Sequence, residues 1–564
     1  MIKFCGHQFF VLLNKLFNAV LTTKTWPWSE GEVIFLRKPG KDDYTNTSAY
    51  GPITKTSYIC KFLERVLEMR LSQHLGAKSI IPPSQNGFRK GYSTDTYMHT
   101  LISSIQHELK CKQKVAGIFV DLQKAFDSVW VNGLLFKMYQ LGIRGSFLEL
   151  MSGFLRYRKI SLTVNGHTTP PTTCKIGVPQ GSVLSPTLFS MYVHDMLENL
   201  SGTRLQYADD TSIVVAAHSN KQLEEICQTN CDVLQKWLTT WRLKANCSKT
   251  EFLLFSGECR TPTIRGIQIS KADETKVLGI LLDNKLKFDS QLVSSVKKMK
   301  SMWARLKPFV FSNLNIECSR RIFLTVILPK ACYLAHLWDT NHRISTYPYI
   351  KDMLRVPFRP PLEHLQVFAQ IRPLRIHYTA ARLNVLRQLI TCNNTNILHS
   401  HNRSNLNQIL KIDGAKFLGL RLIDNFTVLS ANSFSRYKIK AYITTKWKES
   451  WCNYMRSSGN TDGLLSFIEN PTDLIDKSSI PLNNPAKLVG SLCALLTGHT
   501  RLQLHTYKLK LTFSPTCICL EEDESPYHFV FTCKLYSIPR SCSMPSLDDW
   551  HSILSYIMST GKLP

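Results

Sequence analysis

The segment Leu205-Gln206-Tyr207-Ala208-Asp209-Asp210-Thr211-Ser212-Ile213-Val214-Val215-Ala216 sets two adjacent carboxylates between two short apolar, β-prone runs. This pattern predicts a β-hairpin with Asp209 and Asp210 at its tip. Aspartate is tolerated in tight turns, but Asn-Gly or Asp-Gly is the usual pair where only the stability of the turn matters. Two adjacent anions repel each other unless a cation binds them, and carboxylate oxygens suit Mg²⁺. An isolated pair of this kind is more often a solvated acidic turn, so the interpretation depends on a third carboxylate.

That third carboxylate is Asp121, which directly follows the apolar run Val115-Ala116-Gly117-Ile118-Phe119-Val120. A continuous apolar run of this length predicts a buried central strand, and Asp121 stands at its C-terminal end. Together with Asp209 and Asp210 it forms a set able to hold two divalent ions. Such ions lie roughly 3.5–4 Å apart and stabilise the attacking and leaving oxygens of a phosphoryl transfer.

Seven motifs, in the same order and at the same intervals, resemble those of reverse transcriptases, and most closely those of non-LTR (LINE-type, jockey-like) retrotransposons. They are Lys38-Pro39-Gly40-Lys41-Asp42, Gln85-Asn86-Gly87-Phe88-Arg89-Lys90-Gly91, Asp121 with Ala125-Phe126-Asp127, Gly177-Val178-Pro179-Gln180-Gly181-Ser182, Tyr207-Ala208-Asp209-Asp210, Leu243-Lys244-Ala245-Asn246 with Lys249-Thr250-Glu251, and Val277-Leu278-Gly279-Ile280. The resemblance extends from about residue 15 to about residue 340 and fades beyond.

The resemblance implies an α+β fold of the right-hand polymerase type, with fingers, an RRM-like palm built on an antiparallel sheet, and a helical thumb. A mostly helical C-terminal region and a small Cys/His module would follow. The expected divisions are 1–110 for the N-terminal segment and fingers, 111–256 for the palm, 257–340 for the end of the palm and the thumb, 341–480 for a connector of unknown role, and 481–564 for a basic C-terminal region with a zinc knuckle.

The resemblance also assigns the catalytic residues. It implies that Asp121 and Asp209, with Asp210 beside them, bind Mg²⁺ or Mn²⁺, and that Lys249 protonates the departing pyrophosphate. A surface lysine on a connecting turn is the alternative interpretation of Lys249.

Contacts to the incoming nucleotide follow from the same motifs. Lys38 and Lys41 are expected to neutralise the triphosphate, and Gln180 and Gly181 to contact the template and nucleotide. Phe126 matches the steric gate that excludes a 2′-hydroxyl. An ordinary core aromatic is the alternative for Phe126, but its offset of five residues from the first carboxylate favours the gate.

Two local structures around these motifs can be predicted. Residues 32–53 should form the fingers hairpin, turning at Pro39-Gly40. The loop 177–182 should lead into a helix with Ser185 as its cap and Pro186 in its first turn.

One position departs from the family pattern. Tyr50-Gly51-Pro52-Ile53 stands where the family has Tyr-Arg-Pro-Ile, so Gly51 replaces a phosphate-binding arginine. Glycine cannot reproduce the bidentate fork of a guanidinium group. Arg37 is a candidate substitute because it is close in sequence. This departure keeps open a second hypothesis, that the chain is a decayed, non-catalytic nucleic-acid-binding protein derived from a polymerase.

The composition agrees with a nucleic-acid partner. The chain of 564 residues has 69 Lys and Arg against 41 Asp and Glu, a net charge of +28. An excess of this size favours a polyanion, although a cationic protein of the membrane surface is the competing class. The segment 296–307 reads as a basic amphipathic helix and fits a thumb helix along a duplex backbone, with a solvated helix face as the alternative. No run of about 20 apolar residues is present, so we predict no membrane span.

The cysteines indicate a reducing compartment and one metal site. Seventeen cysteines, an odd number scattered along the chain, do not resemble a disulfide framework. Cys517, Cys519, His528 and Cys533 form the pattern C-x-C-x₈-H-x₄-C, which predicts a tetrahedral Zn²⁺ site. Chance clustering in a cysteine-rich chain is the alternative.

The function we predict is RNA-directed DNA polymerase activity, with an RNA template, a DNA primer, dNTPs and the element's own RNA as partners, and with no membrane partner. An RNA-templated RNA synthesiser is a further alternative, which Phe126 opposes. Relatives of this type usually carry an endonuclease before the polymerase, and we expect that function to lie outside this chain. Either a partner supplies the nick or the chain is a fragment of a longer element, and we favour the fragment. The resemblance implies work in the nucleus, after a cytoplasmic stage before import.

Overall fold

The computed structural model describes most of the chain, namely residues 5–38, 43–46, 49–164, 166–312, 315–339, 341–356, 359–391, 422–423, 427–428, 435–458, 463–467, 475, 486–537, 539–540, 545 and 549–560. The chain forms two compact units. One comprises Met1–Leu286 with Gln388–Asn407, and the other Lys287–Arg387 with Gln408–Pro564. The first division between the units therefore falls inside the segment 257–340 that we assigned to the end of the palm and the thumb.

A five-stranded sheet forms the centre of the first unit, with the strand order β12-β9-β3-β8-β7. The strands are β12 (Ser270–Ala272), β9 (Glu251–Ser256), β3 (Lys114–Val120), β8 (Asp210–Ala217) and β7 (Thr203–Tyr207). The predicted central strand is confirmed, because β3 runs antiparallel between β8 and β9 and is buried along almost its whole length.

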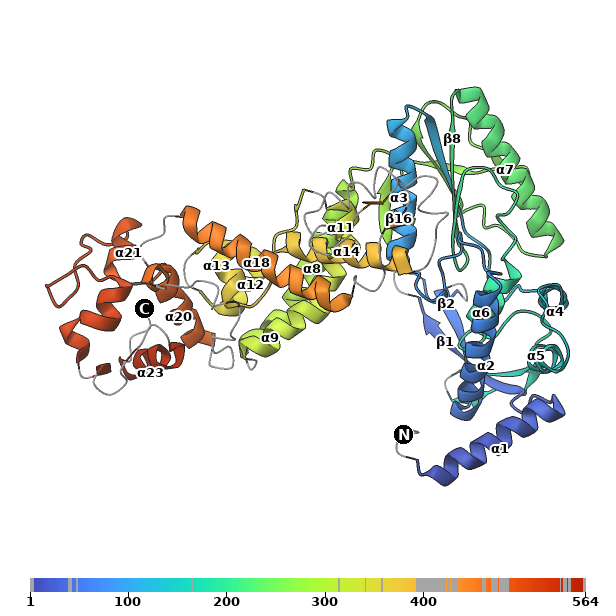
Figure 1. The fold of residues 1–564 in the computed structure, drawn as a ribbon, viewed down its shortest axis with the longest axis horizontal. Helices are drawn as coiled ribbons and strands as arrows, with labels where there is room; N and C mark the ends of the chain where they lie inside the picture. The colour runs from blue at the N-terminus through green and yellow to red at the C-terminus, as the bar shows by residue number, and fades with distance from the viewer. Residues whose placement is uncertain are drawn as a thin grey trace. The chain divides into compact units, whose positions relative to one another are not determined.

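Helices cover both faces of this sheet, which explains why β3 is a continuous apolar run rather than an alternating one. On one face, α3 (Thr94–Lys110) contacts β3, β7 and β8, and the buried Tyr97 donates a hydrogen bond to Ser212 Oγ at 2.6 Å. On the other face, α7 (Asn220–Thr240) packs against the main apolar core. Figure 1 shows α3 and α7 on opposite sides of β8.

A second sheet contains the predicted fingers hairpin. Strand β1 (Glu30–Arg37) pairs antiparallel with β2 (Tyr50–Lys55) and parallel with β4 (Lys159–Val164). The hairpin predicted over 32–53 is therefore confirmed. Its expected turn at Pro39-Gly40 lies outside the described residues.

Helix α6 (Ser185–Tyr192) follows the loop 177–182, but its start differs from our prediction. Leu184 is the N-cap and Ser185 the first helical residue, so Ser185 as the cap was wrong by one position. The Ser185 hydroxyl donates instead to the carbonyl of Pro179 at 2.8 Å, which ties the helix start to the preceding loop. Pro186 in the first turn is confirmed.

Further helices among the described residues of the first unit are α1 (His7–Thr23), α2 (Tyr58–Ala77), α4 (Val131–Gln140) and α5 (Ser146–Arg156). A hairpin of β13 (Glu274–Val277) and β14 (Ile280–Asp283) lies near its end.

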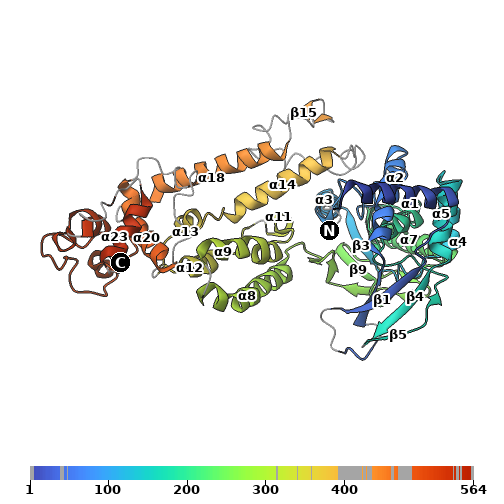
Figure 2. The ribbon, with the colours of Figure 1, turned by 90° about the horizontal axis from the view of Figure 1, so that it is seen from below.

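The described part of the second unit is mostly helical, as predicted (Figure 2). Its main helices are α8 (Asp289–Ser312), α9 (Ile316–Ile322), α12 (Tyr347–Leu354), α13 (Leu362–Phe368), α14 (Leu374–Thr391), α18 (Arg436–Ser458), α20 (Ala486–Thr497), α21 (Gln503–Lys508) and α23 (Trp550–Thr560). Within the described residues, no helix combines the length and apolar character needed to cross a membrane.

Candidate active site

The predicted hairpin is confirmed, with a small correction to its turn. Tyr207 pairs with Asp210, so Ala208 and Asp209 form the two-residue turn and Asp210 opens β8. Ala208 has a φ of +59°, a backbone conformation that L-residues rarely adopt. The Gln85 side chain stabilises this turn, because its Oε1 accepts a hydrogen bond from the Ala208 N–H at 3.1 Å.

The segment around Gln85 explains one of the matched motifs. A Cβ atom on Gly87 would lie 2.5 Å from the backbone nitrogen of Ala208, so only glycine fits there. The Gly87 N–H donates to the same Gln85 oxygen at 2.9 Å. Sequence reasoning did not identify Gln85 as a support for the site, although it opens the Gln85–Gly91 motif.

The three predicted carboxylates gather at one end of the central sheet. Asp121 follows β3, whose last residue pairs with the residue after Asp210 in β8. Burial, with Asp209 and Asp121 adding to it, raises the pKa of Asp210 to about 6. Burial, and next the Asp121 charge, raise the pKa of Asp209 as well. Mutual repulsion of this kind is relieved by a bound cation, so the site fits divalent metal ions.

Lys249 and Asn246 reach Asp121 from the segment before β9. The Lys249 Nζ lies 3.8 Å from Asp121 Oδ2, and Asn246 Nδ2 donates to the same oxygen at 2.9 Å. The Asn246 backbone N–H also donates to the Asp121 carbonyl at 2.8 Å. Lys249 is largely exposed yet faces the carboxylates. Asn246 was missed as a site contact, and its only sequence signal is its place in the Leu243–Asn246 motif.

These groups border an open cavity of about 440 Å³. Asp121, Asp210 and Lys249 line it, together with residues of the β13–β14 hairpin. The carboxylates therefore face a space large enough for a ligand rather than packed side chains.

Phe126 is held in a fixed position near this site. Its ring stacks on Phe189 with centroids 4.7 Å apart and an interplanar angle of 16°, and it meets the edge of Phe88 at 6.4 Å. Its carbonyl accepts a hydrogen bond from the Val178 N–H at 2.8 Å. Phe126 is only partly buried, so it combines a core contact with some surface that is accessible to solvent.

The loop 177–182 lies between Asp127 and strand β2. Gln180 Nε2 donates to Asp127 Oδ1 at 3.0 Å, and the Gln180 carbonyl accepts from the Thr54 N–H at 2.7 Å. Gly181 has a φ of +107°, and a Cβ there would lie 2.7 Å from the Thr54 carbonyl oxygen. Gln180 and Gly181 are therefore held between Asp127 on one side and Thr54 of β2 on the other.

Gly51 is the position that departs from the family pattern, and the structure shows which positively charged side chain lies beside it. Leu36 pairs with Gly51 and Arg37 with Tyr50, so the Arg37 side chain lies on the opposite face of the hairpin from position 51. A Cβ on Gly51 would instead lie 3.8 Å from Lys38 Cε. Lys38, rather than Arg37, is the neighbour of the missing arginine, and Lys41 lies outside the described residues.

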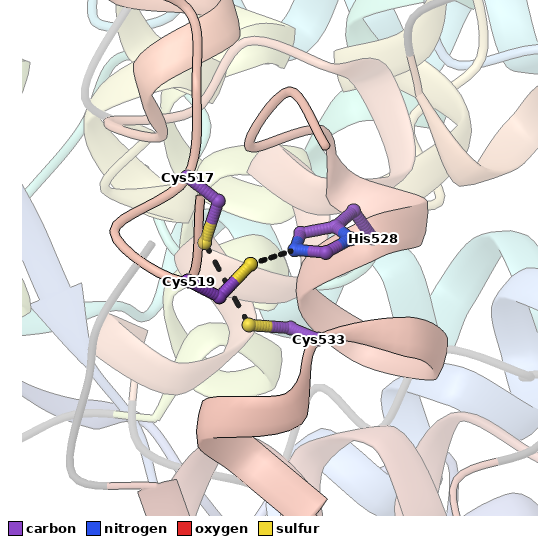
Figure 3. A group of neighbouring side chains, drawn as sticks. All are labelled: Cys517, Cys519, His528 and Cys533. Atoms are coloured by element: carbon purple, nitrogen blue, oxygen red, sulfur yellow. Dashed lines mark hydrogen bonds between the residues drawn. The ribbon is translucent and has the colours of Figure 1, made fainter. Parts of the chain in front are cut away.

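The second predicted site, the Cys/His cluster, lies in the second unit (Figure 3). The ligand atoms of Cys517, Cys519, His528 and Cys533 all lie within 4.8 Å of one another. Cys517 Sγ is 3.6 Å from Cys533 Sγ, and Cys519 Sγ is 3.2 Å from His528 Nε2. Tetrahedral Zn²⁺ with bonds of about 2.3 Å to sulfur and 2.0–2.1 Å to nitrogen separates its ligand atoms by roughly 3.5–3.8 Å. Three thiols and one imidazole at this spacing fit Zn²⁺.

His528 is oriented by Glu522, a residue that sequence reasoning missed. The distance from His528 Nδ1 to Glu522 Oε2 is 2.9 Å, and Thr532 Oγ1 lies 3.0 Å from the same nitrogen. These contacts direct Nε2 toward the thiols. A carboxylate behind a histidine ligand is a common support of zinc sites.

Residues 36–282 match the family described as reverse transcriptase (RNA-dependent DNA polymerase). This match and the carboxylate site define that part of the chain as a reverse transcriptase domain with a mixed α/β fold. The chain is similar to the RNA-directed DNA polymerase from mobile element jockey of Drosophila melanogaster, with 29% identity over 347 residues, 59% of this chain and 38% of that protein. The resemblance to jockey-like non-LTR reverse transcriptases is confirmed.

A more distant likeness extends through the second unit. The retrovirus-related Pol polyprotein from type-1 retrotransposable element R1 of Bradysia coprophila is 23% identical over 541 residues, covering 92% of this chain and 50% of that protein. Among solved structures, the truncated apo telomerase of Candida tropicalis aligns over 48% of this chain and 58% of that chain at 13% identity, with a TM-score of 0.34. The chain spans half or less of these two retrotransposon proteins.

Proposed function

We propose that the chain is an RNA-directed DNA polymerase that extends a DNA primer on an RNA template. The observation that carries the proposal is the meeting of Asp121, Asp209 and Asp210 at one end of the central sheet inside a reverse transcriptase domain, where Asp121 and Asp210 line a cavity. These carboxylates would hold Mg²⁺ or Mn²⁺, which when bound supplies charge stabilisation for the transfer of a nucleotide to a 3′-hydroxyl.

The surrounding residues have separate tasks in this proposal. Lys249, beside Asp121, is placed to give a proton to the departing pyrophosphate. Lys38 and Lys41 neutralise the triphosphate, and Gln180 and Gly181 contact the template and the nucleotide. In this arrangement Lys38 also takes over part of the role of the arginine that Gly51 replaces, since it borders that position.

The right-hand arrangement belongs to the same proposal. The β1–β2 hairpin corresponds to the fingers, the five-stranded sheet to the palm, and α8 to a thumb helix along the duplex backbone. Helix α8 carries Lys297, Lys298, Lys300, Arg305 and Lys307, and a cationic helix of this kind suits a phosphate backbone.

The direct test is primer extension by the purified chain on poly(rA)/oligo(dT) with Mg²⁺ and dTTP. The proposal expects extension, which would also show that Gly51 is tolerated. Tight, salt-sensitive binding of the duplex without extension would favour the second hypothesis, a decayed polymerase that only binds nucleic acid.

Replacing Phe126 with Ala tests the sugar gate. We expect the variant to incorporate ribonucleotides at least about tenfold more efficiently relative to dNTPs, because the ring no longer fills the space beside the 2′ position. The measurement is the ratio of kcat/KM for dTTP and UTP on the same template. The exposed Phe136 on α4 supplies the control Phe136→Ala, which should leave this ratio unchanged. An unchanged ratio in Phe126→Ala would contradict the gate.

We further propose that the Cys/His cluster binds Zn²⁺ and forms a module that contacts nucleic acid. The purified chain should contain one equivalent of zinc, and Glu522→Gln should weaken Zn²⁺ affinity by about 10–100-fold, because His528 loses its orienting carboxylate. Competition with a chromogenic chelator measures this affinity. The matched control is Glu521→Gln, whose carboxylate pairs with Lys534 instead of His528. Equal zinc affinity in both variants would contradict the role of Glu522.

Two broader expectations complete the proposal. The element's own RNA is the template that we expect, on the basis of the similarity to RNA-directed DNA polymerases of mobile elements. The nucleus is the site of action, with a cytoplasmic stage before import.

A further inference from the structure

A buried carboxylate outside the catalytic set holds the end of the loop 177–182. Glu64 lies on the inner face of α2 and has no exposed surface. Its Oε2 accepts hydrogen bonds from Ser182 Oγ and from the Val183 backbone N–H, each at 2.6 Å. The separation in sequence is 118 and 119 residues, so these are tertiary contacts rather than helix-internal ones.

This carboxylate is unusual for its position. The same face of α2 buries Leu63, Leu67, Leu71 and Leu75, and an apolar side chain at position 64 would continue that face. Burying a carboxylate is unfavourable unless hydrogen bonds or a cation compensate it. Among the described residues, Glu64 forms no ion pair. A third hydrogen bond comes from the Cys60 thiol, which donates to Glu64 Oε1 at 3.3 Å. The contribution of Glu64 therefore lies in its hydrogen bonds to the loop rather than in packing or in pairing with a cation.

The two hydrogen bonds to Glu64 lie where the loop 177–182 leads into helix α6. Helix α6 has Leu184 as its N-cap, which supplies no side-chain acceptor. The first backbone N–H groups of a helix need acceptors, and an anion near this end is favourable. Glu64 supplies an acceptor at Val183, and the Ser182 hydroxyl that it binds accepts in turn from the Leu184 N–H at 3.1 Å.

The other end of the loop is anchored separately. The Gly177 N–H donates to the Val129 carbonyl and the Val178 N–H to the Phe126 carbonyl, each at 2.8 Å. Gln180 and Gly181 lie between these bonds and the Glu64 contacts.

We propose that Glu64 is a positioning residue for nucleotide binding. Its buried carboxylate fixes the C-terminal end of the loop, so that Gln180 and Gly181 keep their place against the incoming nucleotide. The inference rests on the proposed polymerase function. A residue acting in this way changes the affinity for dNTP through loop geometry without touching the reacting atoms.

The test compares Glu64→Leu and Glu64→Gln with wild type in the full chain. We expect Glu64→Leu to raise KM for dTTP by about tenfold or more with a smaller change in kcat, since small displacements of positioning groups have large effects. Backbone amide hydrogen exchange at 180–184 should accelerate in the same variant. Glu64→Gln should restore both readouts, because its amide oxygen accepts the same two bonds.

The matched control is Glu68→Leu, one turn further along α2, where the carboxylate accepts hydrogen bonds from Arg65 and Ser72 of the same helix and, among the described residues, forms no bond to the loop. It should leave KM and exchange unchanged. If Glu64→Leu does not fold, Ser182→Ala removes one of the two bonds and should raise KM by a smaller factor. Unchanged exchange in the loop, or faster exchange with an unchanged KM, would overturn the proposal. A wild-type chain without extension would overturn the proposed function instead, and hydrogen exchange would still decide whether Glu64 holds the loop.

Discussion

Asp209→Asn should reduce primer extension by at least about a thousandfold, because charge stabilisation by bound metal ions contributes several kcal/mol to the transition state. The carboxylate stands in the turn between β7 and β8, beside Asp121 and Asp210, where burial and the Asp121 charge raise its pKa. An amide of the same shape keeps the turn but lowers the negative charge that attracts the cations. Primer extension with dTTP and Mg²⁺ measures the effect.

Binding separates loss of chemistry from loss of fold. The Asp209→Asn variant should bind the same primer–template duplex with near wild-type affinity and the same dependence on salt, since lysine and arginine side chains, which the substitution leaves in place, provide the attraction to phosphate. Asp232→Asn is the matched control, because Asp232 is exposed on α7 and its carboxylate accepts a hydrogen bond from Gln228 of the same helix, away from the catalytic carboxylates. Extension retained in Asp209→Asn would show that this carboxylate does not serve the reaction.

Asp195→Ala should destabilise the first unit by about 3 kcal/mol, because it leaves the Lys137 ammonium group buried without its carboxylate. Lys137 on α4 is 1% exposed, and its Nζ donates to Asp195 Oδ1 at 2.5 Å and to the Tyr192 carbonyl at 2.7 Å. The rings of Trp241 and Trp237 lie 3.8 Å and 4.6 Å from the same nitrogen. Trp237 Nε1 would also lose its acceptor, since it donates to Asp195 as well. Thermal unfolding of the variant measures the loss.

The pH dependence of stability and the variant Lys137→Met check this buried-charge explanation. Burial lowers the pKa of Lys137 to about 8 in the folded chain, so the unfolded state binds more protons between that value and 10.5. The stability contributed by this group therefore rises with pH across that window. Loss of Asp195, which raises the pKa of Lys137, lowers that pKa further, so the deficit of Asp195→Ala should shrink as the pH rises toward 8 and change little above it. Lys137→Met should be milder, because the partly exposed Asp195 can then be solvated. A larger loss in Lys137→Met than in Asp195→Ala would contradict the buried-charge explanation.

Local patterns carried much of the prediction. The apolar run before Asp121 specified β3, and the β-prone runs around Asp209 specified the hairpin, since both signals depend on neighbouring residues alone. The error at Ser185 arose because a local rule was applied where a contact made in the folded chain decided the outcome. Sequence rules favour a serine as the cap, but its hydroxyl found an acceptor in the Pro179 carbonyl of the folded loop.

The residues that hold the catalytic carboxylates and their turn in place could not be predicted from local sequence patterns. Asn246 bonds Asp121 across 125 positions, and Gln85 bonds the turn at Ala208 across 123. Each residue alone is an ordinary polar side chain in the sequence. Only the packing of α2, α3 and the central sheet brings these partners together.

The sequence by itself determined the order of the strands and helices that carry the carboxylates, the spacing of the Cys/His ligands, and the strong positive charge, because these follow from local periodicity and composition. The tertiary structure decided which residues support them. It placed Glu64 under the loop, Lys38 beside Gly51 and Glu522 behind His528. The physical reason is that burial and hydrogen-bond partners are properties of the packed chain, and they depend on segments far apart in the sequence.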